Sequence, residues 1–209
     1  MGANKMKKIN QYRSKSFLTL GFLILVFSCS SIPRFQLTYR LPAEQMTLAS
    51  NKVYVTLEDM REDKRIFGEG ARRKFKNIPE SIAFYIALGS APGTGKGIYQ
   101  PPDLLKKALE SRLKHEGIEV IPEGAAPISM SVLLKTFFMD RKDWIWKVTI
   151  SYEARLAIDG KVRASETVSA EAERFELVGK EQAEAMLGEL LTDVVNRLNL
   201  NRLFQESKL

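Results

Sequence analysis

The chain has 209 residues, of which 44% are hydrophobic and 27% are charged, a composition typical of a globular domain. Its formal net charge is +7, but five of the 32 basic residues and none of the 25 acidic residues precede Cys29. From Cys29 onward, 27 basic residues are set against 25 acidic ones, which leaves a net charge of only +2. This balance excludes the concentrated basic surface that a nucleic-acid-binding protein needs.

Residues 1–28 have the pattern of a signal peptide. A basic segment leads into the apolar run 17–27, which is eleven residues long and carries no charge. A membrane-spanning helix needs about 20 apolar residues, so a shorter run behind a basic flank indicates a cleaved export signal. An uncleaved membrane anchor, and a plain secretory signal followed by an incidental cysteine, are the alternatives.

The motif Val26–Cys29 follows the apolar run directly. Its sequence, Val-Phe-Ser-Cys, resembles the lipobox of bacterial lipoproteins, in which a small residue precedes the lipidated cysteine. Cys29 is the single cysteine, so it has no intramolecular disulfide partner. We expect a mature chain that begins at Cys29, carries diacylglyceryl and palmitate groups there, and is anchored to a membrane without spanning it. Because Ser30 is not an aspartate, we expect the outer membrane, with the domain facing the periplasm.

The segment 29–50 contains two prolines, and its apolar residues follow no sustained helical or strand period, which predicts a lipid-anchored tether. A short strand at Leu37 and Tyr39 is expected where the tether meets the domain. We place the domain at 51–204 and a loosely packed tail at 205–209.

The first half of the predicted domain opens with an alternating strand at 52–57, which a charged turn ends. Residues 61–100 are predicted to form one long loop region that contains a short strand at 82–88. A helix then begins at Pro101, with leucines spaced four residues apart, and Gly117 is its expected stop. Its polar residues, Arg112 among them, are expected to face water.

Three alternating runs, which begin at Ile128, Trp144 and Val162, predict an antiparallel meander. Asp159-Gly160 joins the second run to the third and is a strong hairpin signal. A helix with one apolar stripe follows over residues 180–198. The predicted fold is α+β: a two-layer sandwich with a mainly antiparallel sheet and two helices on one face, in the order β-α-β-β-β-α.

Residues 90–97, Ser-Ala-Pro-Gly-Thr-Gly-Lys-Gly, resemble the phosphate-binding loop of ATPases. Ser90 stands where the first glycine belongs, and Gly97 stands where a magnesium-binding hydroxyl belongs. Pro101 and Pro102 follow shortly, whereas a phosphate loop runs straight into a helix. We therefore expect a loop without nucleotide binding, and no cofactor.

For the remaining candidate residues, a structural role is favoured over catalysis or metal binding. An acidic cluster could bind a hard cation, but basic neighbours and irregular spacing favour a solvated turn; its members are Glu58, Asp59, Glu62 and Asp63. His115 is the single histidine and has no nucleophile or metal-ligand partner in the sequence. Trp144 and Trp146 are expected in the core, or alternatively on an exposed apolar strip.

A resemblance to the YajG-like lipoproteins rests on the stretch from Val53 to Gly68. Its motif residues, whose role is unknown, are Asp59, Arg61 and Gly68, followed by a helix ending in glycine, a meander and a final helix. It covers 52–204 and implies an envelope lipoprotein but no reaction. Residues 71–97 are longer than the family pattern.

The sequence thus predicts a non-enzymatic, lipid-anchored envelope lipoprotein whose domain binds another envelope component, a protein or a lipid. An accessory lipoprotein of a lipid or lipopolysaccharide transport system is the main alternative. A carboxylate-based hydrolase is a remote one.

Overall fold

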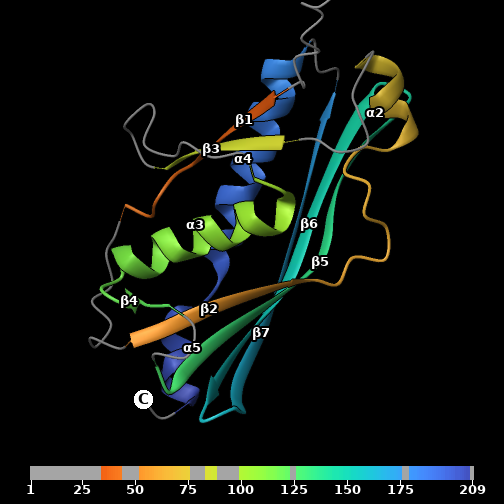
Figure 1. The fold of residues 1–209 in the computed structure, drawn as a ribbon. Helices are drawn as coiled ribbons and strands as arrows, with labels where there is room; N and C mark the ends of the chain where they lie inside the picture. The colour runs from red at the N-terminus through yellow and green to blue at the C-terminus, as the bar shows by residue number, and fades with distance from the viewer. Residues whose placement is uncertain are drawn as a thin grey trace, which may run out of the picture. The chain divides into compact units, whose positions relative to one another are not determined.

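The structure, a computed structural model, describes residues 34–43, 52–75, 83–88, 99–122, 126–175 and 179–207, all within the compact unit Pro33–Leu209. Three strands, β5 (Ile128–Lys142), β6 (Ile145–Ile158) and β7 (Lys161–Phe175), form an antiparallel meander (Figure 1). The turn between β6 and β7 has positive φ at both Asp159 (48°) and Gly160 (75°), as the predicted hairpin requires. The three alternating runs and their hairpin are therefore confirmed.

A β-bulge in β5 changes which of its side chains face the core. The register between β5 and β6 shifts between Leu134 and Thr136, which leaves Lys135 as an extra residue. Core-facing positions are even-numbered up to Leu134 and odd-numbered from Phe137 onward. One inserted residue has this effect because side chains alternate with a period of two.

β2 (Lys52–Asp59) lies along the other edge of β5 and pairs with it in parallel. The two-residue strand β4 (Glu119–Val120) extends the sheet to the order β4-β2-β5-β6-β7. Parallel neighbours need a crossover connection, and α3 (Pro101–His115) lies within it. The strand at 52–57 is confirmed, whereas its parallel pairing was not predicted.

A second sheet pairs β1 (Arg34–Tyr39) with β3 (Ala83–Leu88) in parallel. Phe35, Leu37 and Tyr39 alternate toward the core and are at most 1% exposed. The domain therefore includes residues that the sequence assigned to the tether 29–50, and it begins earlier than residue 51. The expected strands at Leu37–Tyr39 and at 82–88 are confirmed, while Cys29 and the signal peptide lie outside the described residues.

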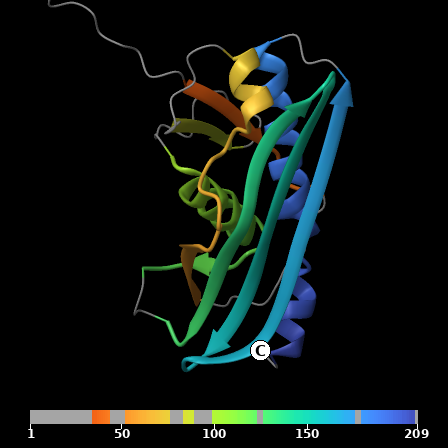
Figure 2. The same ribbon diagram turned by 90° about the vertical axis from the view of Figure 1, so that its right-hand side faces the viewer.

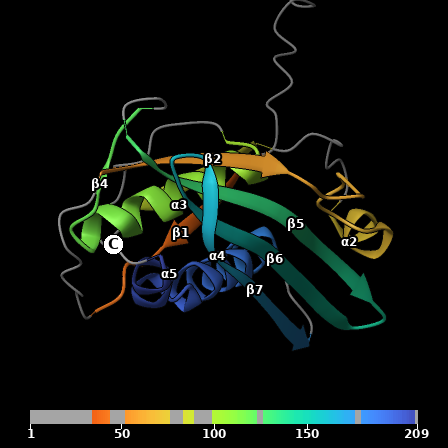
Figure 3. The same cartoon turned by 90° about the horizontal axis from the view of Figure 1, so that it is seen from below.

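The helices cover one face of the meander. α3 and α4 (Lys180–Arg197) lie on the same side of β5, β6 and β7, as the view from below shows (Figure 3). Gly117, with φ of 83°, follows the end of α3 as predicted. The predicted α+β sandwich is thus confirmed, and the opposite face of the meander is not covered by these helices.

Two short helices were not predicted. α2 (Glu69–Lys74) lies beside β5, and α5 (Leu200–Glu206) continues the helical layer after α4 (Figure 2). α5 buries Leu200, Leu203 and Phe204, so the chain near residue 205 is packed rather than loose. The predicted tail 205–209 therefore begins too early.

Side chains fill the space between the helices and the sheet. The leucine stripe of α3 and the apolar stripe of α4 are buried against the meander, and most of their members have no exposed surface. Trp146 lies fully in this core, whereas Trp144 is 56% exposed in the turn before β6. The core interpretation of the two tryptophans is therefore confirmed for Trp146 and wrong for Trp144.

Candidate functional site

The motif residues Asp59 and Arg61 form a two-pronged ion pair at the end of β2. Arg61 Nε donates to Asp59 Oδ1 at 2.8 Å, and Arg61 Nη2 donates to Asp59 Oδ2 at 2.9 Å. The backbone N–H of Arg61 also donates to Asp59 Oδ1. Because the Arg61 side chain is only 6% exposed, this pair is largely withdrawn from water.

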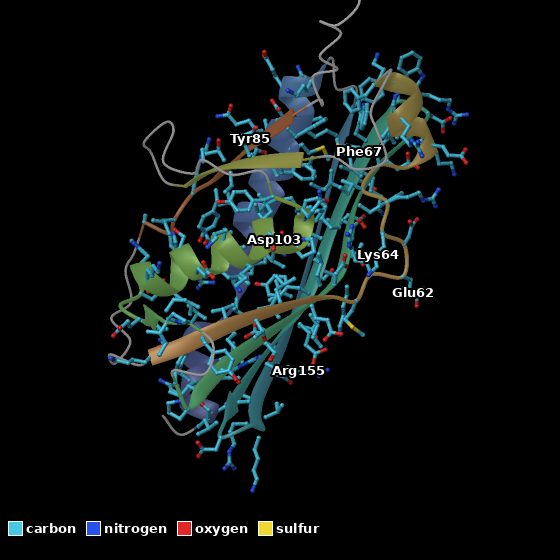
Figure 4. All side chains as sticks on the ribbon, viewed as in Figure 1. Glu62, Lys64, Phe67, Tyr85, Asp103 and Arg155 are labelled. Atoms are coloured by element: carbon cyan, nitrogen blue, oxygen red, sulfur yellow. The ribbon has the colours of Figure 1, made fainter. Side chains whose placement is uncertain are left out.

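Lys64 closes the same turn. Its ammonium donates to the carbonyl of Asp59 at 2.7 Å, and Arg61 Nη1 donates to the carbonyl of Lys64 at 3.3 Å. Figure 4 shows Glu62 and Lys64 on this loop, outside the line of β5. Three side chains thus fix the shape of residues 60–65, which we call the arch.

Backbone hydrogen bonds attach both ends of the arch to β5. Met60 N donates to the carbonyl of Leu134 before the arch. After it, Met139 N donates to the carbonyl of Ile66, and Gly68 N donates to the carbonyl of Met139. The arch therefore lies over the bulge at Lys135, where β5 itself departs from regular pairing.

Gly68, the third motif residue, allows α2 to approach β5. A Cβ atom at Gly68 would lie 2.2 Å from Asp140 Cγ, and one at Gly70 would lie 1.7 Å from the carbonyl oxygen of Arg141. The Asp140 carboxylate accepts the Ala71 N–H at 3.1 Å and so satisfies a free donor in the first turn of α2. The motif residues are therefore brought near β5, and each has a structural task there.

Carboxylates of the predicted acidic cluster are engaged with arginines. Burial alone would raise the pKa of Asp59, but the hydrogen bonds and charge of Arg61 outweigh it and lower that pKa below its usual value. The Arg65 side chain lowers the pKa of Asp63 to about 2. Within the described part of the chain, no group of three or more potential ligands is arranged to hold a metal ion.

A groove of about 710 Å³ opens where the arch meets the uncovered face of the sheet. Its lining residues are Met60, Glu62, Asp63, Lys135, Thr136, Phe137, Phe138 and Thr149. Met60 is 52% exposed, although its backbone N–H is paired with β5. The groove thus joins apolar surface to side chains of both signs of charge.

A second polar cluster, which sequence reasoning missed, lies between α3 and α4. Arg112 was expected to face water, but it is only 5% exposed and Nη1 donates to the carbonyl of Val195 on α4. Glu116 lies beside it, with Oε1 3.9 Å from Arg112 Nε. Tyr152 donates to the carbonyl of Val194 at 3.0 Å, and burial raises the pKa of its hydroxyl. The only sequence signal was that Arg112 lies three residues from Leu109 on the apolar stripe.

The other predicted site residues divide into two groups. His115 lies in the last turn of α3, as expected. Cys29 and the segment that resembles a phosphate loop, residues 90–97, lie outside the described residues. Among the helices that the structure describes, none is long and apolar enough to cross a membrane.

Comparison with solved structures identifies the fold. A Xanthomonas campestris protein of family DUF330 superposes with a TM-score of 0.56 at 16% identity, covering 85% of this chain and 99% of that chain. A minor lipoprotein from Acinetobacter baumannii has a TM-score of 0.40 at 13% identity, with 77% and 95% of the two chains covered. Rare lipoprotein B from Shewanella oneidensis has a TM-score of 0.36 at 12% identity, with 50% and 84% covered. No family model and no curated protein matches the sequence.

The first of these likenesses shows that the chain shares its fold with a DUF330 protein. The other two proteins are lipoproteins by name, and their TM-scores lie below 0.5. At such low identity the comparisons transfer no activity and no site residue. The YajG-like resemblance of Asp59, Arg61 and Gly68 stays a prediction from the sequence.

Proposed function

We propose that this protein is a lipid-anchored, non-enzymatic lipoprotein of the bacterial cell envelope. The lipobox-like motif that ends in Cys29, directly behind a short apolar run, is the observation that carries this proposal. The anchor joins the outer membrane, and the domain faces the periplasm.

The domain binds another envelope component at the groove beside the arch. Three features support this location: hydrogen bonds hold the arch in one shape, the groove lies on the face of the sheet that α3 and α4 leave uncovered, and Met60 is exposed among its lining residues. A fixed frame with an exposed apolar centre and charges around it is the usual anatomy of a protein-binding surface.

Binding explains these features better than catalysis or lipid carriage does. Glu116 is the one fully buried carboxylate of the described residues, and it faces Arg112 rather than a second carboxylate. A hydrolase that uses two carboxylates needs a pair in a cleft. Buried side chains of the described residues pack between the helices and the sheet, which favours binding at the surface over a role in lipid or lipopolysaccharide transport.

Replacement of Cys29 tests the anchor. The intact mass of the native protein should correspond to a chain that begins at Cys29 with acyl groups attached. The Cys29→Ala variant should lose the acyl groups and remain an uncleaved precursor. A wild-type protein without acyl groups would refute the anchoring.

Photocrosslinking in living cells tests the binding surface. A photoreactive amino acid at Met60 should form a discrete adduct with an envelope component. The same amino acid at Val162, which is 58% exposed at the β6–β7 hairpin, is the matched control and should not form that adduct. Equal adducts at both positions, or none at Met60, would contradict the proposed groove.

A further inference from the structure

Exposed apolar side chains gather at one end of the meander. Trp144, Ile145 and Phe175 are 56%, 46% and 72% exposed. Ile145 and Phe175 are Cα partners across β6 and β7, so they lie on the same face of the sheet, and Trp144 precedes Ile145 in the β5–β6 turn. We call these three residues the tip patch. It combines large apolar surface with an indole N–H, which is the chemistry that favours a membrane–water interface.

Basic residues lie next to the tip patch on the side of α2. α2 packs on the end of β5, since Gly70 lies against the carbonyl of Arg141. Five cations occur at this end, on the last turn of α2 and at the end of β5: Arg72, Arg73, Lys74, Arg141 and Lys142. Three carboxylates accompany them: Glu69, Asp140 and Asp143. The Asp140 carboxylate is occupied by the Ala71 N–H, and the Arg141 guanidinium lies 5.3 Å from the centre of the Trp144 ring.

The charges along the adjoining edge are paired within the domain. Arg174 contacts Glu189, and Lys147 contacts Glu171 and Glu173. Among these described residues, the excess of positive charge lies on α2 and the β5–β6 turn, which hold five cations against three carboxylates. Anionic phospholipid headgroups complement such a basic flank beside exposed aromatic residues.

The first residues of β1 lie at this same end of the domain. The Phe35 ring is 6.2 Å from the Phe75 ring, which in turn is 5.0 Å from the ring of Trp146, two residues beyond Trp144. Lys180, at the start of α4, lies over Phe35. Figures 1 and 2 both show β1, α2 and the β5–β6 turn toward the same end of the domain.

The length of chain before β1 limits how far this end can lie from a lipid anchor. Cys29 precedes Arg34 by five residues, and five residues span at most about 17 Å even when fully extended. An acylated Cys29 at the bilayer surface would therefore keep the start of β1, and the tip patch near it, beside that bilayer.

We propose that the tip patch and the basic last turn of α2 rest on the phospholipid surface of the membrane that holds the anchor. This inference depends on the proposed lipid anchoring of Cys29. It gives the domain a defined orientation: β5, β6 and β7 rise from the membrane at their Trp144 end, and the β6–β7 hairpin points away. The groove beside the arch, seven residues along β5 from Lys142, then stands about 23 Å above the tip.

The two tryptophans provide the test, because Trp144 is exposed and Trp146 is buried. The acylated full-length mature protein is placed in vesicles of equal parts phosphatidylcholine and phosphatidylglycerol with brominated acyl chains. The emission of Trp144 is obtained as the difference between the wild type and the Trp144→Phe variant, which loses no core packing. This Trp144 emission should be weaker than in vesicles without bromine, and its maximum should lie at a shorter wavelength than in water.

A control tryptophan reports the far end of the domain. Val162→Trp in the Trp144→Phe background places an exposed indole at the β6–β7 hairpin, and its emission should not be quenched. Quenching of both positions would show that the domain lies flat, and no quenching of Trp144 would show that the tip is free; either result overturns the proposal. In vesicles without phosphatidylglycerol, the emission of Trp144 should be quenched less than in the mixed vesicles. Equal quenching in both would show that the basic last turn of α2 does not contact the membrane.

The intact mass of each preparation separates the two hypotheses. Acyl groups on Cys29 without quenching of Trp144 would reject the orientation and leave the anchor in place. A mass without acyl groups would reject the anchor itself. If Trp144 were shielded from water in native membranes but not in protein-free vesicles, the tip patch would contact a protein partner, and the proposal would be overturned.

Discussion

Two arginine–aspartate pairs of identical spacing occupy different environments on the arch. Arg61 pairs with Asp59 and is 6% exposed, whereas Arg65 pairs with Asp63 and is 56% exposed. The spacing is the same because a turn of this shape returns the arginine to the carboxylate two residues earlier. Only the first pair is buried and also bonds the carbonyl of Lys64 across the arch, so only that pair should support the fold.

We expect Arg61→Met to lower the free energy of unfolding by about 1–3 kcal/mol. The methionine keeps the apolar stem but removes both guanidinium donors from the Asp59 carboxylate and the Nη1 donor from the Lys64 carbonyl. Urea denaturation measures the effect. Arg65→Met is the matched control and should leave the midpoint unchanged, because exposed pairs contribute little. Equal losses in both variants would show that burial does not decide the role of the pair.

The pH dependence of stability should report the same pair. The pKa of Asp59 is lowered in the folded state, so the unfolded state binds the proton more readily. Stability from this pair is therefore fully present above the ordinary aspartate pKa of about 4 and is lost as the pH falls through the lower folded value. Glu153, whose pKa is lowered to about 2 by Arg155 and Lys135, adds a loss of the same sign.

The slope of stability against pH below about pH 4 should thus be shallower in Arg61→Met than in the wild type. Urea midpoints measured between about pH 6 and pH 2 test this. Glu153 and its partners are unchanged in the variant, so a residual slope is expected. Identical slopes in the two proteins would contradict the assignment of the lowered pKa to Arg61.

Gly70 is required by the approach of α2 to β5. Alanine favours helix by about 1 kcal/mol over glycine, so a free helix would gain from Gly70→Ala. Here the added Cβ would lie 1.7 Å from the carbonyl oxygen of Arg141, and we expect a net loss of about 1–3 kcal/mol. In Gly179→Ala no atom lies within 4 Å of the new Cβ, so this control should cost less than about 1 kcal/mol. Thermal unfolding of the two variants measures both losses, and the midpoint of Gly70→Ala should fall further below the wild type than that of Gly179→Ala.

At the scale of elements, α4 covers the open edge of β1 with polar side chains. Glu184 accepts the Gln36 N–H at 2.7 Å, and Thr192 accepts the Arg40 N–H at 3.2 Å. Gly188 lets the helix approach, since a Cβ there would lie 3.0 Å from the carbonyl oxygen of Thr38. An unpaired strand edge invites association with other chains, and the helix prevents this.

Asn196→Ala should loosen β1 more than α4. Asn196 accepts the Tyr39 hydroxyl at 2.9 Å and donates to the carbonyl of Arg40 at 3.0 Å, so its loss leaves two polar groups without partners. Hydrogen exchange should accelerate at the β1 amides. Asp193→Ala removes an exposed pair with Arg197 on the same helix and should leave β1 exchange unchanged. Equal exchange in wild type and Asn196→Ala would show that the edge is held by other contacts.

At the scale of the whole molecule, α5 closes the helical layer at the end away from the tip patch. Leu200 and Leu203 are fully buried, and Arg202 contacts Glu166 on β7 at 3.3 Å. Leu203→Ala should therefore cost about 2–5 kcal/mol by leaving a cavity. Gln205→Ala, on the exposed side of the same helix, should change the unfolding midpoint little. A neutral Leu203→Ala variant would indicate that the C-terminal residues pack loosely after all.

Of the two short helices that were not predicted, α5 did have a sequence signal. Asn199 accepts the N–H of Arg202 and is the N-cap of α5, and Leu200, Leu203 and Phe204 follow at helical spacing. The helix predicted over residues 180–198 stops just before this asparagine, which begins α5. A residue that suits both the end of one helix and the start of another is ambiguous until the packing of the next turn is known.

The sequence by itself determined the elements whose pattern repeats many times. The meander, the Asp159-Gly160 hairpin and the two long helices follow from periodicity and turn chemistry, because each strand or helix must turn one face inward whatever it packs against. The sequence also carries the Cys29 motif, on which the proposed anchor depends.

Tertiary structure alone decided the contacts between segments that are distant in the sequence. The burial of Arg112, the attachment of the arch to β5 and the inclusion of β1 in the core depend on which neighbours lie opposite, and local pattern does not encode that. The exposure of Trp144 has the same origin: alternation assigned it to the core, but the strand starts one residue later and the turn directs it outward. Periodicity thus fixes a preferred face for each segment, whereas three-dimensional packing determines where that face ends.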